Sequence, residues 1–378
     1  DGDRVSIRGL GPEFVNSTIN GRRLLSSGTE ARNLRKMNFN AFPPSVLAGV
    51  RVAKGQTASR PESGLAGQID LQTLRPLEIN RLDKKSSFAQ VSVRGEHQDI
   101  SDENGFRVNA LAGWRNDDET FGAYVGIVAS ESNTARDQVR VNYITRNISI
   151  DNDGNGSKDG TIDGVQVPSV ITMNPIREEP KRSAFAAGIQ YRPTDDVDIV
   201  WDLMYSNYNN ESTRQQNQLQ LAATWPATKF DMSDADNPAI IVDENNVLRY
   251  ANYGQSAGGG PARANITTMV FNNETENLIT GLNLDWQHEQ WSANFDVYYS
   301  DIHYTQDLRF PRVRKVLDKS QLVFDATGNL PLSSLSNTNE LDGYQFFRTT
   351  VREIELDGDN YGATLKFNYL LDDSAISS

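Results

Sequence analysis

The chain contains no cysteine and only three histidines among its 378 residues. Without cysteine there is no disulfide scaffold, no cysteine-ligated zinc site and no thiol nucleophile. His97, His288 and His303 are far apart in the sequence and show no ligand spacing, so they predict no metal site. The sequence also lacks a nucleophile elbow, a phosphate-binding P-loop and an HExxH motif. We therefore expect a protein that is not an enzyme.

Basic residues are outnumbered, with 37 Lys and Arg against 50 Asp and Glu and a formal net charge of −13. This balance argues against nucleic acid as a partner, because no basic stripe is present to meet phosphates. Long apolar runs are also missing. The longest, around Phe121–Ala129, is far below the ~20 residues of a membrane-spanning helix. Transmembrane β-barrels are not excluded, since they place hydrophobic side chains only at alternate positions.

The first eighty residues form one compositional unit that is rich in glycine. Val5–Gly9, Phe14–Ile19, Ala48–Ala53 and Gln68–Thr73 are short segments that read as strands. Asn20-Gly21 is a strong signal for a hairpin turn. The pattern predicts a small α+β unit, in which Arg32–Asn40 is a short helix or a loop.

From Ser87 onward the chain alternates apolar and polar residues in segments of about ten residues. About eight segments show this pattern: Ser87–His97, Phe106–Arg115, Phe121–Ala129, Phe185–Tyr191, Val197–Tyr205, Leu278–Trp286, Trp291–Tyr299 and Tyr361–Tyr369. Their polar positions carry Asp, Asn, Arg and Lys, which suits a wet barrel lumen. Trp and Tyr concentrate near the segment ends, as interfacial girdles require. The pattern predicts an antiparallel transmembrane β-barrel.

Connections between these segments alternate between short and long. Arg115–Glu119, Pro193–Asp196 and His288–Gln290 are very short. The long connections, expected as extracellular loops, are residues 131–182, 207–276 and 301–359. Membrane barrels have short periplasmic turns and longer external loops. A water-soluble β-sandwich is the alternative, which we disfavour because soluble hairpins rarely need loops longer than about 15 residues.

A glycine-rich unit that leads into a barrel resembles the TonB-dependent receptor family of Gram-negative outer membranes. The resemblance is carried by VSIRGLG at 5–11, TINGR at 18–22, LAGVRV at 47–52, KG at 54–55, GLAG at 64–67, IDLQT at 69–73 and Arg75-Pro76. It implies a mainly β chain, with the C-terminal part of a plug domain at residues 1–80. The N-terminal part of a barrel follows at residues 81–378, with about eight of an expected 22 strands.

The resemblance further implies TonB-dependent active import of a scarce, large ligand across the outer membrane. The implied partners are TonB, whose contact segment is not in this chain, outer-membrane lipid and the ligand itself; no cofactor is required. A receptor that signals through an upstream domain is one alternative. A non-transporting adhesin or porin is another, although it gives no reason for a plug. Asn, Gln and aromatic residues in the loops favour a carbohydrate over a ferric siderophore.

Two sets of residues follow from this reading. Ligand contacts are expected at the plug apex and in the long loops, at Arg22, Arg23, Tyr208, Trp225, Tyr250 and Tyr253. A latch between plug and barrel is expected from cations on the plug strands and carboxylates in the lumen, namely Arg8, Arg51 and Arg75 with Asp198, Asp202 and Asp296. Breaking such ion pairs would free the plug to move.

A third candidate lies in the first long loop, where residues 151–164 read DNDGNGSKDGTIDG. Asp151, Asp153, Asn155 and Asp159 repeat with the spacing of a calcium-binding loop, and Asp163 follows the position where an EF-hand would place its glutamate. The pattern predicts a Ca²⁺ site, with a polar loop that binds no metal as the alternative.

Overall fold

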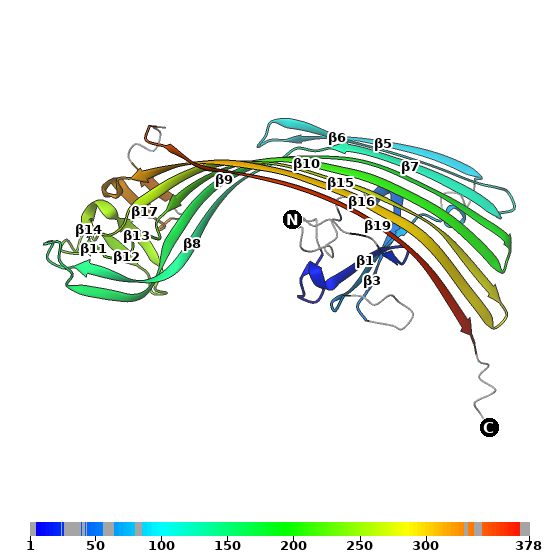
Figure 1. Ribbon diagram of the computed structural model, residues 1–378, viewed down its shortest axis with the longest axis horizontal. Coiled ribbons are helices and arrows are strands. Elements are labelled where there is room, and N and C mark those ends of the chain that lie inside the picture. The colour runs from blue at the N-terminus through cyan, green and yellow to red at the C-terminus, as the bar shows by residue number, and fades with distance from the viewer. Residues whose placement is uncertain are drawn as a thin grey trace, which may run out of the picture.

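The computed structural model describes residues 5–23, 25, 39, 42, 44–55, 64–79, 85–328, 332–335 and 342–370. A small mixed sheet near the N-terminus lies beneath a long, curved antiparallel sheet (Figure 1). Further short strands gather at the end of the large sheet away from the small one. Among these residues, no helix is long and apolar enough to cross a membrane.

The small sheet, which we call the plug sheet, has the strand order β2-β1-β4-β3. Its strands are β1 (Val15–Ile19), β2 (Arg22–Arg23), β3 (Leu47–Ala53) and β4 (Gly67–Thr73). β1 runs parallel to β4, and the other two pairs are antiparallel. Three of the four predicted strands are therefore confirmed. Val5–Gly9 is not a strand, because the chain turns at Arg8 and Gly9 and forms only an isolated bridge between Ile7 and Leu10. The described helical elements beside them are 3-10 turns, η1 (Pro12–Phe14), η3 (Pro44–Val46) and η4 (Pro76–Glu78), and most of the predicted α part lies outside the described residues.

The large sheet, which we call the wall, consists of very long strands. They are β5 (Ser87–Gln98), β6 (Glu103–Arg115), β7 (Phe121–Glu131), β8 (Thr134–Asp151), β9 (Gly160–Thr194), β10 (Val197–Gln220), β15 (Ala262–His288), β16 (Trp291–Leu317) and β19 (Gln345–Tyr369). β7 and β8 pair with β9 one after the other, through Glu131 opposite Lys181 and Thr134 opposite Glu178. They form one interrupted strand, which confirms the prediction of about eight.

The connections confirm the three short turns, at residues 116–120, 195–196 and 289–290. A fourth short turn, residues 99–102, joins β5 to β6 at the opposite end of the wall. The predicted alternation of short and long connections therefore begins only after β6.

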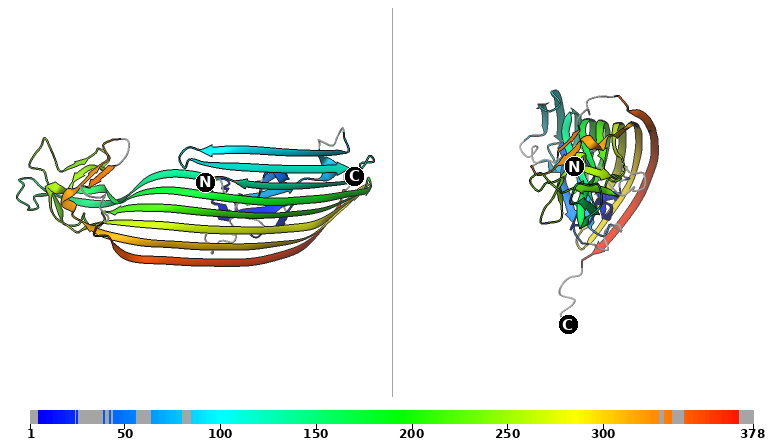
Figure 2. Two further views of the ribbon diagram at one scale, coloured as in Figure 1. Left: turned by 90° about the horizontal axis from the view of Figure 1, so that it is seen from above. Right: turned by 90° about the vertical axis from the view of Figure 1, so that its left-hand side faces the viewer.

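The prediction of long loops at residues 131–182, 207–276 and 301–359 is wrong for most of their length. Strands β8, β9, β10, β15, β16 and β19 continue deep into these segments, and Figure 2 shows them running on toward the far end of the molecule. Asn207–Gln220 illustrates the reason, because it is polar at most positions and yet pairs residue by residue with Arg263–Glu276. Backbone pairing continues where neither face is apolar, so the alternating signal ends before the strand does.

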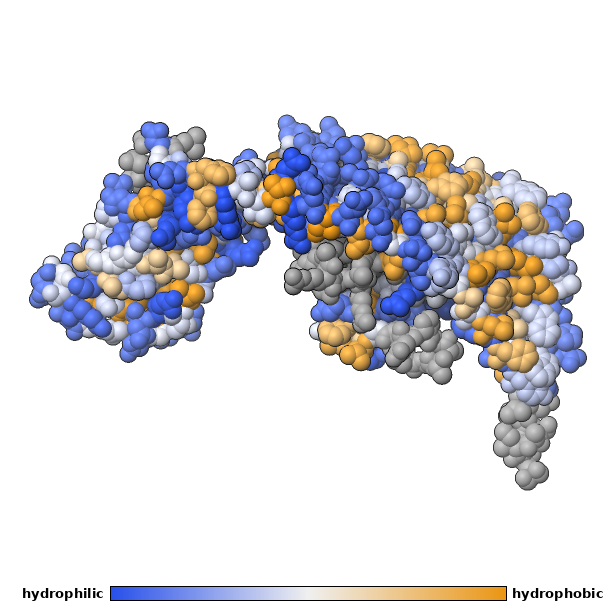
Figure 3. All heavy atoms as spheres, in the orientation of Figure 1, coloured by the Kyte–Doolittle hydropathy of each residue, from blue (hydrophilic) through white to orange (hydrophobic). Residues whose placement is uncertain are grey.

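Alternation along the wall separates two faces. Asp202 and Met204 on β10 are buried on the concave side, against the plug sheet. The opposite face exposes large hydrophobic side chains: Val125, Ile127, Phe185, Ile189, Tyr191, Leu282, Trp291, Phe295, Val297, Tyr299, Tyr361, Leu365, Phe367 and Tyr369. In Figure 3 hydrophobic side chains gather over the right-hand half of the sheet. This apolar outer belt is what a lipid-facing surface requires.

Two hydrophobic cores hold the chain together. The first joins plug and wall, with Ile19, Ile69 and Leu71 packed among wall residues such as Met204 and Ile279. The second lies in the far end of the molecule, which we call the distal lobe (residues 219–262 and 317–328 with the strand ends packed on them). Its short elements are β11 (Thr228–Asp231), β12 (Ile240–Val242), β13 (Leu248–Asn252), η6 (Tyr253–Gln255), β14 (Ser256–Gly258), η7 (Lys319–Gln321) and β17 (Leu322–Asp325), with β18 (Leu332–Leu335) paired to β17.

Candidate functional site at the plug and wall interface

The plug sheet reaches the wall through the turn between β1 and β2. Asn20 and Gly21 have φ angles of 53° and 78°, the left-handed pair that a tight type I′ hairpin needs. The Asn20 side chain donates to Thr73 Oγ1 at 2.8 Å and to Asp202 Oδ1 of the wall at 3.2 Å. Asp70 accepts the Gly21 backbone N–H at 2.7 Å. The turn is thus fixed by β4 on one side and by β10 on the other.

Arg22 follows this turn and joins the plug to two wall strands. Its Nη1 donates to both oxygens of Asp202 on β10 at 2.8 Å. Its Nε and Nη2 donate to Asp296 on β16 at 2.9 Å each. The Arg22 side chain is only 2% exposed, and that of Asp202 only 4%. One guanidinium therefore bridges two carboxylates, and the Asp296 side chain is 13% exposed.

This arrangement depends on mutual neutralisation. Burial alone would lower the pKa of the Arg22 guanidinium, but the hydrogen bonds and charges of Asp296 and Asp202 raise it above its ordinary value. The cation stays charged, and its planar fork suits paired carboxylates. Removing one partner of such a buried pair typically costs about 3–5 kcal/mol, because the other charge is left uncompensated. We call Arg22, Asp202 and Asp296 the latch.

A glycine in the wall makes room for the latch. Gly281 lies on β15 between the strands that carry Asp202 and Asp296. A Cβ atom placed there would come within 2.4 Å of Arg22 Cζ. The guanidinium can therefore lie flat against the wall only because position 281 has no side chain.

A second contact lies where the plug chain leaves toward the wall. Gln190 of β9, which is fully buried, accepts the Leu77 backbone N–H through Oε1 at 2.9 Å. The same amide donates to Asp198, and Arg75 Nη1 lies 3.6 Å from that carboxylate. Arg75 is 39% exposed, so this ion pair is weaker than the latch.

The structure brings some of the predicted latch residues together and leaves others apart. Asp198, Asp202 and Asp296 all meet plug residues, and Arg75 does reach Asp198. Among the described residues, Arg8 and Arg51 form no ion pair with these carboxylates. Arg8 occupies an exposed left-handed turn, with a φ of 55°, and Arg51 lies exposed on the edge strand β3. Arg22, which was predicted to contact ligand, provides the main cation instead.

A polar cavity of about 620 Å³ lies between the plug sheet and the wall beside the latch. Besides the latch itself, its lining includes Arg51, Asp70 and Gln72 of the plug, with Asn283 and Asp285 of the wall. Charged and amide side chains face this space from both sides, so it is suited to water and polar solutes.

Two of the predicted ligand contacts lie in the interior of the distal lobe. Trp225 and Tyr253 are 3% and 1% exposed in the distal core, where their rings pack at 5.5 Å between centroids. Trp225 Nε1 donates to the Pro168 carbonyl, so its polar atom is also used internally. Aromatic residues in these segments build a core because strands β11–β14 and β17 need one. Composition alone could not show this.

The other predicted ligand contacts have mixed positions. Tyr208 is 9% exposed on the concave face, with the Arg182 guanidinium 5.3 Å from its ring centre. Tyr250 is half-buried on β13, and Arg23 is exposed beside the latch. Of the six residues predicted, Arg23 and Tyr250 are the ones with substantial exposure.

The aspartate-rich loop brings three of its five predicted ligands together. Asp151, Asp153 and Asp159 each offer a carboxylate oxygen, and these oxygens all lie within 4.8 Å of one another. Asn155 donates to Asp153 at 2.8 Å. Backbone N–H groups lower the pKa of Asp151, although burial opposes this; the Gly156 N–H is the main donor, at 2.6 Å. Asp163 lies beyond the group, on β9. The three carboxylates fit a hard cation, and the Ca²⁺ site remains a prediction.

Part of the chain is similar to known proteins. Residues 1–68 match the TonB-dependent Receptor Plug Domain family. No curated protein matches the chain. Among solved structures, the outer membrane transporter YddB from Escherichia coli is 10% identical, with a TM-score of 0.33, over 96% of this chain and 52% of the other.

Two further solved structures are similar to the same extent. The siderophore receptor PiuA from Acinetobacter baumannii is 11% identical, with a TM-score of 0.29, over 97% of this chain and 56% of the other. The hemophore receptor HasR from Serratia marcescens is 13% identical, with a TM-score of 0.26, over 94% and 54%. The chain therefore spans about half the length of the solved structures it matches. Its first 68 residues are similar to the plug domain of TonB-dependent receptors.

Proposed function

We propose that the protein takes part in TonB-dependent uptake of a ligand across the outer membrane of a Gram-negative cell. The observation that carries the proposal is a plug sheet clamped to the concave face of a wall whose outer face is apolar. The family is one of transporters rather than enzymes, in agreement with the expectation from sequence. In this role the apolar belt faces lipid, and the plug closes the lumen.

The latch supplies the resistance that an energised step would overcome. Arg22 holds the plug to β10 and β16 at once, so the plug sheet cannot leave the wall without exposing two carboxylates and a guanidinium. Water entering from the adjacent cavity would solvate these charges and lower the cost of separating them. A pull on the plug by TonB, transmitted through β1 and β2, is the step we propose for opening this path.

The ligand class is the finer part of the proposal. Carbohydrate was favoured over a ferric siderophore by aromatic residues in the long connections, and the burial of Trp225 and Tyr253 removes two of them. A signal-transducing receptor and a non-transporting barrel remain alternatives. The plug and its buried latch support energised transport over a passive barrel, because a plug held in the lumen by buried ion pairs would block passive diffusion.

Uptake in a deletion strain tests the proposal. Cells without the protein should lose growth on one class of ligand, either oligosaccharides or iron supplied as ferric siderophores, and the gene should restore it only when TonB is functional. Restored uptake that persists without TonB would contradict energised import. Equal growth of deletion and parent strains on every ligand would argue for an adhesin or another non-transporting role.

A further inference from the structure

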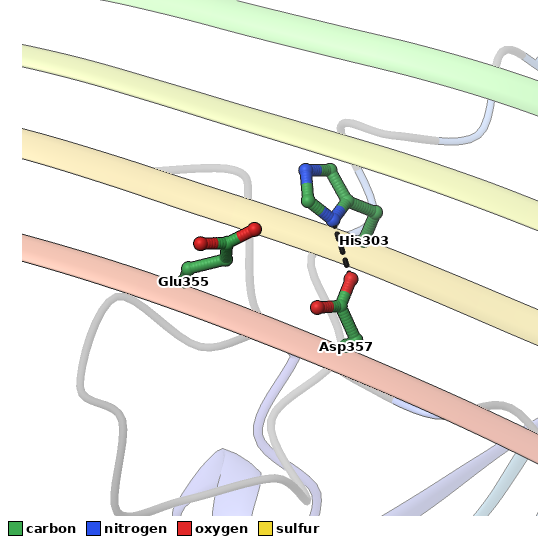
Figure 4. A group of neighbouring side chains, drawn as sticks. All are labelled: His303, Glu355 and Asp357. Atoms are coloured by element: carbon green, nitrogen blue, oxygen red, sulfur yellow. Dashed lines mark hydrogen bonds and ion pairs between the residues drawn. The ribbon is translucent and has the colours of Figure 1, made fainter.

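Three side chains of different chemical types converge on the outer face of β16 and β19. They are His303, Glu355 and Asp357, and Figure 4 shows them projecting from the two neighbouring strands. One ligand atom of each lies within 4.8 Å of the others. His303 Nδ1 is 2.5 Å from Asp357 Oδ1, and these two residues are direct register partners. The sequence could not suggest this, since more than fifty positions separate the histidine from the acids.

The cluster lies on the face opposite the latch. Side chains on β16 alternate, so that Asp296 and the buried Ile302 share the concave face while Tyr299 and His303 share the outer one. His303 and Asp357 are 37% and 71% exposed. The cluster is therefore separate from the plug, the latch and the cavity.

Its position along the strands is equally specific. Tyr299 and Tyr361 are register partners at the edge of the apolar outer belt, and both are exposed. His303 follows Tyr299 by four residues, and Asp357 precedes Tyr361 by four. The cluster thus lies just past the aromatic rim, on the side toward the distal lobe.

The surrounding outer face is strongly acidic. Glu276 of β15 is the register partner of His303 on its other side, and Glu274 and Glu276 both accept from the Asn207 side chain. The same patch carries Asp301, Asp307, Glu353 and Asp359. Arg309, which pairs with Asp307 at 2.9 Å, offsets only part of this charge. A surface of this kind attracts cations.

We propose that His303, Glu355 and Asp357 bind a divalent cation of the zinc type. One imidazole nitrogen and two carboxylate oxygens form a mixed donor set that suits Zn²⁺ better than Ca²⁺ or Mg²⁺, which take oxygen ligands. Three protein ligands leave coordination positions open toward the surroundings. In the membrane orientation, which rests on the proposed function, the cation lies level with the lipid headgroups and neutralises part of the acidic patch.

Calorimetry with Zn²⁺ alone tests the site on the purified protein in detergent, at a mildly alkaline pH that keeps imidazole neutral. We expect one saturable binding event per chain that is lost in H303Q and in the double variant E355Q/D357N. H288Q is the matched control, because His288 also contacts a carboxylate, Asp196 at 2.9 Å, and lies outside the cluster. H288Q should bind Zn²⁺ as the parent protein does.

Spectroscopy distinguishes a specific Zn²⁺ site from a general attraction of cations to the acidic surface. The chain has three histidines, so NMR of imidazole-labelled protein reports on each one. Zn²⁺ should shift the His303 resonances at concentrations that leave His97 and His288 unchanged. Equal shifts of all three, or unchanged Zn²⁺ binding in H303Q, would show that His303 and Asp357 form only an ion pair. Binding in detergent needs no transport, so this result is independent of any failure in the uptake assay.

Discussion

The Arg22 guanidinium on the plug and the Asp202 carboxylate on the wall share two hydrogen bonds of 2.8 Å, although the residues are 180 positions apart. Asp296 completes the contact from a third element. The plug is thus attached to the wall by charge as well as by its apolar core, and the charged contact is the one that water can reverse.

Replacement of Arg22 by methionine should loosen the plug. The variant keeps apolar bulk and leaves Asp202 and Asp296 buried without a cation, at a cost of about 3–5 kcal/mol. Hydrogen exchange of β1 and β4 should become faster, while β15 and β16 near their turn stay protected. R23M is the control, because Arg23 is adjacent and exposed. Identical protection of β1 in both variants would contradict the role assigned to Arg22.

The G281A variant should disturb the same contact from the wall. The added methyl group would lie 2.4 Å from Arg22 Cζ, so the guanidinium must shift away from one of its two carboxylates. Overpacking of this kind costs about 1–3 kcal/mol, measured as a lower urea midpoint for plug release. G95A serves as control, since a Cβ at Gly95 meets nothing within 4 Å. A midpoint that is unchanged in G281A would show that the wall tolerates the methyl group.

The strands of the plug and the apolar halves of the wall strands were predictable, because alternation and the Asn20-Gly21 turn are local signals. The cation that pairs with Asp202 was not predictable. Arg22 and Arg51 look alike in the sequence, and only the position of the plug against the wall decides which of them reaches Asp202. The polar extension of β10 past Asn207 was missed because its apolar alternation ends there while its backbone pairing goes on. The burial of Trp225 could not be predicted either. The core around it is assembled from three distant segments, and such a core has no local signature in the sequence.

W225A should unfold the distal lobe selectively. The indole packs against Phe230 and Tyr253 and donates to the Pro168 carbonyl, so its loss costs about 3–5 kcal/mol. Thermal melting should show an early transition, and faster hydrogen exchange in β11 and β13 should locate this transition in the distal lobe. Y250A, at a half-buried position on β13, should cost clearly less. Equal effects of the two variants would mean that Trp225 is not part of a cooperative core.

The Ca²⁺ prediction is tested by calorimetric titration of the protein with CaCl₂. D153N removes a carboxylate of the group while keeping its size, and should abolish the heat of binding. D163N should not, because Asp163 lies outside the group of three. Lys229 already donates to the Gly156 carbonyl of this loop at 2.8 Å, so the cation must bind beside a fixed positive charge. A titration without heat in the millimolar range would dismiss the metal.

The pKa of the His288 imidazole should lie above its ordinary value of 6.5. The hydrogen bond to Asp196, at 2.9 Å, is the main cause, and the Asp196 charge adds to it; together they raise the pKa of the imidazole. Because the folded-state pKa is higher than the unfolded one, the bond stabilises the turn fully below about pH 6.5, and this contribution is lost as the pH rises through the folded-state pKa. NMR titration should show the pKa of His288 falling in D196N. In D195N, which alters the same turn without removing the bond, the pKa should stay raised, and a fall of equal size there would mean that general acidity of the turn, rather than Asp196, sets the value.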